Sequence, residues 1–140
     1  LMHGQHLIRS YSSTQSVIAL SAGEAEFYAI VRGASVFLGA KSMAQDYGYE
    51  YTGRLWTDAT AGQGIASRRG LGRTKHIHTQ YLWVQQKCHR NELEIRQDAT
   101  EENVADLMTK YLTQERISKL LDRMGCILQS GKSALTLEAT

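Results

Sequence analysis

The feature that most constrains the fold is a long helical stretch that opens at Ser21. Its apolar side chains recur at the spacing of one helical face: Phe27, Val31, Ala34 and Leu38. The chain contains no proline, so glycine must end most of its elements, and Gly48 is the expected end of this helix. A helix with one apolar face needs a second layer that covers this face.

Two glutamates, Glu24 and Glu26, stand in the first turn of this helix. Positions i and i+2 point to different sides of a helix, so the two carboxylates cannot share a face. Ser21 and Glu24 have capping-box spacing, in which the serine accepts from the Glu24 amide and Glu24 reaches back to the Ser21 amide. This gives Glu24 a structural role. For Glu26 the structural alternative is a favourable interaction with the helix dipole, and it is the candidate for chemistry.

β-prone and partly alternating residues predict strands at 6–11, 54–57 and 92–97. Helical patterns separate or follow them, over 59–69 and 76–91, from an N-cap at Thr100 through Leu112, and over 113–124 with Gly125 as the stop. Long helices between strands indicate a layered α/β arrangement rather than a helix bundle.

Two aspartates join Glu26 as candidate metal ligands. Asp58 directly follows a predicted strand, where it is either a helix N-cap or a ligand at the carboxyl end of a sheet. Asp106 interrupts the apolar stretch "NVADLM", where an exposed surface position is the alternative. Mg²⁺ takes carboxylate oxygens and usually needs one or two of them plus substrate phosphate. Such a set suits a metal-dependent cleavage of phosphodiesters.

Six basic residues lie between positions 68 and 90 with no acidic residue among them: Arg68, Arg69, Arg73, Lys75, Lys87 and Arg90. Such a stretch could line a phosphate backbone, or form a solvated loop and helix face. The net charge of +2 is too small to favour a nucleic-acid partner by itself.

Other chemistries fit the sequence less well. There is no GxSxG motif, and "GQGIAS" lacks the Lys-Ser/Thr of a phosphate loop. His76 and His78 would diverge on a helix, and Cys88 and Cys126 form no CxxC pair. No apolar run approaches the roughly 18 residues that span a membrane, and the first residues lack the apolar core of a secretory signal. We therefore expect an intracellular protein, cytoplasmic or nuclear, without a membrane partner.

Four stretches carry a resemblance to a known family. They are "YSSTQSVIALSAGEAEFYAI", "LWTDATAGQGIAS", "RTKHIHTQYLWVQ" and "NVADLMTKYL". In order and spacing they resemble the ribonuclease H domain of copia-type retrotransposon polyproteins, whose usual forms are close to SSAEAEYMAL, CDNQSAI, RTKHIDIRYHFI and QLADIFTKPL. The similarity covers roughly residues 6–112, and "TKHI" together with "ADLMTK" makes it specific.

This resemblance implies a nuclease that cuts the RNA strand of RNA–DNA hybrids with Mg²⁺ or Mn²⁺. Its family's carboxylates fall on Glu26, Asp58 and Asp106, which would be both catalytic residues and metal ligands. Arg73, Lys75 and His76 match the family's RTKH and would face the hybrid or the scissile phosphate. With Arg68 and Arg69 of the basic stretch, they are the expected nucleic-acid-binding residues. Its partners would be the hybrid and an upstream reverse transcriptase region of the same polyprotein.

The family's fold is a mixed α/β sheet of order 3-2-1-4-5 flanked by helices. Residues 6–11, 54–57 and 92–97 would be strands 3, 4 and 5, and nothing matches strands 1 and 2 or the family's first aspartate. We therefore expect a partial domain over 6–112, a helical extension over 113–128 and a flexible tail over 129–140. Alone, it would be marginally stable or rearranged, with strand 3 pairing directly on strand 4, and inactive. The alternative is a catalytically dead remnant that binds nucleic acid.

Overall fold

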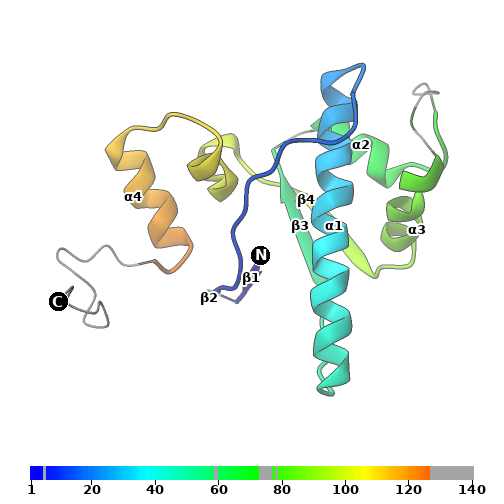
Figure 1. Ribbon diagram of the computed structural model, residues 1–140, viewed down its shortest axis with the longest axis horizontal. Coiled ribbons are helices and arrows are strands. Elements are labelled where there is room, and N and C mark those ends of the chain that lie inside the picture. The colour runs from blue at the N-terminus through cyan, green and yellow to red at the C-terminus, as the bar shows by residue number, and fades with distance from the viewer. Residues whose placement is uncertain (5, 59, 73–76, 78, 127–140) are drawn as a thin grey trace, which may run out of the picture. The chain divides into compact units, whose positions relative to one another are not determined.

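A computed structural model describes residues 1–4, 6–58, 60–72, 77 and 79–126. These residues form a mixed α/β structure with two small sheets and four α-helices (Figure 1). They divide into two compact units. The main unit is Ser12–Asn103, and the second unit joins Leu1–Tyr11 to the described residues from Val104 onward.

Helix α1 (Ala22–Asp46) is the long helix that the apolar stripe predicts. It begins at the predicted N-cap, Ser21, whose backbone is extended. It ends as Gly48 predicts: Gly48 has φ +82°, and its amide and that of Tyr49 donate to carbonyls of the last helical turn. This pair of bonds is a Schellman motif, which glycine favours because it has no Cβ to strain.

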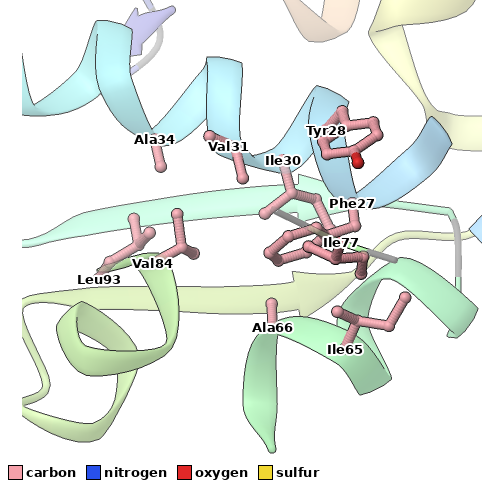
Figure 2. Packing of buried hydrophobic residues seen from close by; sticks show 10 residues of the cluster. All are labelled: Phe27, Tyr28, Ile30, Val31, Ala34, Ile65, Ala66, Ile77, Val84 and Leu93. Atoms are coloured by element: carbon pink, nitrogen blue, oxygen red, sulfur yellow. The ribbon is translucent and has the colours of Figure 1, made fainter. Parts of the chain in front are cut away.

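The core of the main unit forms along one face of α1. Its buried apolar members are Phe27, Tyr28, Ile30, Val31 and Ala34 from α1, Ile65 and Ala66 from α2 (Thr60–Ser67), and Ile77, Val84 and Leu93. Figure 2 shows Phe27 and Ile30 of α1 next to Ile77, on the side of the helix that faces Ala66 and Ile65. Leu38, the last residue of the predicted stripe, is only partly buried.

Strands β3 (Gly53–Thr57) and β4 (Leu93–Gln97) pair in parallel, with Gly53 opposite Leu93 and Thr57 opposite Gln97. One face packs Leu55 and Ile95 against the core, while Trp56 and Arg96 stay exposed. The expected strands 4 and 5 are therefore neighbours. Two strands do not establish the sheet order 3-2-1-4-5, which stays a prediction.

Two glycines let α1 lie close to β3. A Cβ at Gly53 would lie 2.2 Å from the ring of Phe37, and one at Gly33 would lie 2.9 Å from Leu55. Neither distance leaves room for a side chain. The absence of a side chain at these positions therefore sets how closely the helix approaches the sheet.

The strand predicted over residues 6–11 is shorter than expected and has a different partner. Only β2 (His6–Leu7) is extended and paired, in a short antiparallel hairpin with β1 (Met2–His3) and not with β3. Gly4, at φ +59°, turns the chain back, and the amides of Ile8 and Arg9 both donate to the Leu1 carbonyl. Closing this local hairpin costs less chain entropy than pairing with a distant strand.

The helix expected over 76–91 is described in two pieces, the 3-10 helix η1 (Thr79–Tyr81) and α3 (Trp83–His89), and its start lies outside the described residues. The Tyr81 ring packs edge-to-face against Tyr28, with ring centroids 5.1 Å apart. We attribute the interruption to this packing, since tertiary contacts override helix propensity.

The prediction of one continuous helix from Thr100 is wrong. Two short 3-10 helices, η2 (Thr100–Glu102) and η3 (Val104–Met108), stand in its place, and the N-cap of η2 is Ala99. Asn103 between them has an extended ψ of 105°, and Asn is a weak helix former.

The last helix, α4 (Gln114–Arg123), agrees with prediction. Thr113 is its N-cap, and Gly125 ends it at φ +68°. The helix lies within the expected 113–128 extension, and the expected tail at 129–140 lies outside the described residues.

Candidate functional site

Glu24 has the structural role that its spacing from Ser21 predicts. Ser21 Oγ accepts from the Glu24 backbone N–H at 3.2 Å, and the Glu24 side chain is buried. The Glu24 carboxylate accepts from the Leu20 backbone N–H at 2.8 Å and from the Tyr28 hydroxyl at 2.7 Å, two partners that the capping-box prediction did not name. Burial, and then the bond to Glu24, raises the pKa of Tyr28 to about 12.

Glu26 has different surroundings. Its side chain is partly exposed, and with the described residues it forms no hydrogen bond or ion pair. It lies where α1 crosses α2: a Cβ at Gly62 would lie 3.0 Å from the Glu26 Cβ and 3.1 Å from Ile30 Cδ1. Glycine at position 62 therefore allows α2 to pass directly beside Glu26.

Asp58 lies in a bend between β3 and α2, at the carboxyl end of the strand as predicted. It is partly exposed and, like Glu26, bonds to none of the described residues. The beginnings of α1 and α2 are in contact, because a Cβ at Gly23 would lie 2.9 Å from the Ala61 Cβ. The fold thus brings Glu26 and Asp58 to the same end of the main unit.

Asp98 is an acidic residue at this end that sequence reasoning missed. It follows β4 as Asp58 follows β3, and its backbone N–H donates to the Thr57 carbonyl at 2.9 Å, which extends the parallel pairing by one step. Its Oδ1 accepts from the Ala99 backbone N–H at 3.1 Å. The rule that singled out Asp58, an aspartate directly after a strand, would also have found Asp98.

Asp106 belongs to the second unit, so it lies in a different unit from Glu26 and Asp58. It is 2% exposed, not a surface aspartate. Its two carboxylate oxygens each pair with a cation at 2.9 Å, Oδ1 with Lys110 Nζ and Oδ2 with Arg116 Nη2 of α4. The pair with Arg116 connects η3 to α4, while the pair with Lys110 is local to the residues that follow η3.

The donor chemistry of Glu26 and Asp58 fits a hard divalent cation, since Mg²⁺ takes carboxylate oxygens and keeps several waters. A set of three ligands is not formed: within the described ranges, no group of three or more His, Cys, Asp or Glu side chains could hold a metal ion. The two cysteines, Cys88 and Cys126, are free, and burial raises the pKa of the Cys88 thiol.

Two of the predicted nucleic-acid-binding residues are described. Arg68 folds back over Gly72, and its guanidinium donates to the Leu71 carbonyl. Arg69 is exposed. The other three, Arg73, Lys75 and His76, lie outside the described residues.

None of the described helices is both long and apolar enough to cross a membrane.

Comparison with known proteins gives a distant relative. Over 118 residues, 81% of this chain, the sequence is 26% identical to the retrovirus-related Pol polyprotein from transposon TNT 1-94 of Nicotiana tabacum. The chain spans 9% of the length of that polyprotein. No protein-family model and no solved structure matches this chain. The chain is therefore similar to a short region of a retrotransposon Pol polyprotein.

Proposed function

We propose that this chain is the ribonuclease H region of a copia-type retrotransposon Pol polyprotein. In that role it cleaves the RNA strand of RNA–DNA hybrids with Mg²⁺ or Mn²⁺ during reverse transcription. The observation that carries the proposal is the pair Glu26 and Asp58, which lie at one end of the main unit without structural partners among the described residues. The motif order and the similarity to a Pol polyprotein support it.

The chain's residues would divide the work between holding metal and holding substrate. The carboxylates of Glu26 and Asp58 would bind the cation, which when bound supplies an activated water and stabilises the leaving oxygen. Exposed Arg69 would contact the phosphate backbone. Residues 6–112 would form the nuclease domain, alongside an upstream reverse transcriptase region.

Two further carboxylates would complete the metal site. As a third ligand, Asp106 would have to exchange its contacts with Lys110 and Arg116 for the cation. The family's first aspartate has no counterpart among these 140 residues, so another part of the polyprotein would supply it.

The test is cleavage of an end-labelled RNA–DNA hybrid by a polyprotein that contains this chain. We expect Mg²⁺-dependent cleavage that Asp58→Asn abolishes. Asp46→Asn, which makes the same chemical change at the exposed end of α1, is the matched control and should cleave like the wild type. Full activity of the Asp58→Asn protein would remove Asp58 from the site.

A catalytically inactive nucleic-acid-binding remnant is the second candidate. The ion pairs of Asp106 favour it, because Lys110 and Arg116 satisfy a carboxylate that a nuclease would need for metal. Cleavage by the 140-residue chain, compared with cleavage by a polyprotein that contains it, distinguishes the two. A remnant binds hybrid in every context and never cleaves, whereas a nuclease region gains activity when the rest of the polyprotein is present.

A further inference from the structure

Gln85 is a buried polar side chain for which no sequence motif predicts a role. It lies on α3, is 4% exposed, and uses its whole amide in hydrogen bonds. Its Nε2 donates to the Ile65 carbonyl at 2.8 Å and to the Gly70 carbonyl at 3.0 Å, and its Oε1 accepts from the Gly70 backbone N–H at 2.8 Å. One side chain thus ties α3 to the last turns of α2 and to the residues that follow α2.

This chemistry is specific to a primary amide. The three bonds need two N–H donors and one acceptor oxygen on the same uncharged side chain, and only the primary amide of Gln or Asn supplies this combination. A carboxylate would retain the bond from Gly70 but would place its negative charge against two carbonyl oxygens. A hydrocarbon of similar size would leave the polar groups of Ile65 and Gly70 without these bonds, which is costly in the interior.

The backbone held by Gln85 belongs to a basic loop. Gly70 has φ +73° and Gly72 φ +57°, conformations that glycine adopts readily, and between them the Leu71 carbonyl accepts from the Arg68 guanidinium. The loop therefore has a defined path through residues 68–72. Arg69 directly precedes Gly70, whose backbone N–H and carbonyl are bonded to Gln85, and the Arg69 side chain is exposed.

We propose that Gln85 is a positioning residue for nucleic-acid binding, which fixes the basic loop so that Arg69 contacts a backbone phosphate of the hybrid. Gln85 itself touches no substrate. The inference rests on the proposed function, because it takes an RNA–DNA hybrid as the ligand. It assigns a role in binding to Gln85 of α3, which is neither one of the candidate metal ligands nor one of the basic residues predicted to bind nucleic acid.

The test measures how hybrid binding depends on salt, with the same polyprotein used for the cleavage assay. Each phosphate contact adds about 0.7–0.9 to the slope of log affinity against log salt. We expect Arg69→Ala and Gln85→Leu each to reduce this slope by about one contact. The double variant should match either single variant, because both remove the same contact. Gln86→Leu, the same change at the exposed neighbouring position, should leave the slope unchanged.

The outcomes separate this inference from the function on which it rests. If the wild type binds hybrid but folded Gln85→Leu keeps the full slope, Gln85 is merely structural and the inference fails. Additive losses in the double variant would also overturn it. If the wild type does not bind hybrid at all, the proposed function fails and takes the inference with it. Should Gln85→Leu not fold by circular dichroism, Gln85→Glu, which keeps the bond from Gly70, is judged by the same slope.

Discussion

The carboxylate of Glu24 is a buried acceptor for Leu20 and Tyr28, whereas that of Glu26 lies partly exposed beside Gly62. We expect Glu24→Gln to lower the free energy of unfolding by about 1–3 kcal/mol, because the amide cannot accept at both ends. Glu26→Gln should change it by less than about 0.5 kcal/mol. Urea denaturation of the two variants checks this. Equal destabilisation by both would contradict the assignment of a structural role to Glu24 alone.

Tyr28 makes stability depend on pH in the alkaline range. Its pKa is raised from 10.0 to about 12 in the folded chain, mainly by burial, so between these values the folded state binds more protons than the unfolded state. Stability is therefore intact below pH 10 and falls as pH rises towards 12. Tyr28→Phe should remove this part of the alkaline fall, measured by denaturation at a series of pH values. An unchanged pH profile would contradict the raised pKa.

At single positions, the sequence predicted local roles and missed tertiary ones. Capping geometry and strand ends are encoded by nearby residues, so spacing alone predicted the N-cap at Ser21, the structural role of Glu24 and the position of Asp58 at a strand end. Gln85 could not, because its partners are fifteen and twenty residues away along the chain. The Arg116 partner of Asp106 is likewise on another helix, so spacing indicated a metal ligand or an exposed position for this aspartate and not a buried ion pair.

The close crossing of α1 and α2 depends on glycine at position 62, which has no side chain. In α2, a Cβ at Gly62 would lie 3.0 Å from the Glu26 Cβ, whereas a Cβ at Gly64 would meet no atom within 4 Å. Alanine in a helix is normally favoured over glycine by about 1 kcal/mol. We expect Gly64→Ala to stabilise the chain by up to that amount. Gly62→Ala should destabilise it by about 1–3 kcal/mol through overpacking.

Thermal and urea unfolding of the two glycine variants make a matched comparison, since both positions lie in the same helix. A Gly62→Ala protein as stable as the Gly64→Ala protein would mean that α1 and α2 can separate without cost. The close approach at Glu26 would then not be a fixed feature of the fold.

Elements with strong end signals were predicted well, and those defined by packing were not. The ends of α1 and α4 are each specified by a capping residue and a glycine, and both agree with prediction. The stretches after residues 76 and 100 show helical patterns without a glycine stop, and the N-cap predicted at Thr100 lies inside η2, whose N-cap is Ala99. Packing and an extended Asn103 divide these stretches. Residues 6–11 are β-prone, but a strand forms only where a partner is available.

Over the whole chain, protection from hydrogen exchange should be uneven. The β1–β2 hairpin has two residues in each strand, and such hairpins are marginal in water. The amides of α1 around Phe27 and Ala34 lie over the buried core. We expect slow exchange in this part of α1 and fast exchange over residues 6–11, measured by mass spectrometry on the 140-residue chain. Strong protection of 6–11 would contradict the pairing described for it.

Fold class was predictable at the scale of the molecule, but the complete architecture was not. Alternating helices and strands predicted a layered α/β arrangement. Strands β3 and β4 are the expected neighbours, and they pair in parallel. Among the described residues of the main unit, the sheet has two strands, β3 and β4. No pattern within these residues could supply strands that they do not contain.

The role of Glu26 is tested by comparing Glu26→Gln with Glu24→Gln in a polyprotein that contains this chain, with Mg²⁺ and a labelled RNA–DNA hybrid. The measured quantity is the cleavage rate of the folded fraction. We predict that Glu26→Gln loses more than the roughly 10–100-fold typical of removing a residue that only supports a metal ligand. Glu24→Gln should keep its rate where it remains folded. Wild-type cleavage by the Glu26→Gln protein would contradict the central claim that Glu26 belongs to a metal-dependent nuclease site.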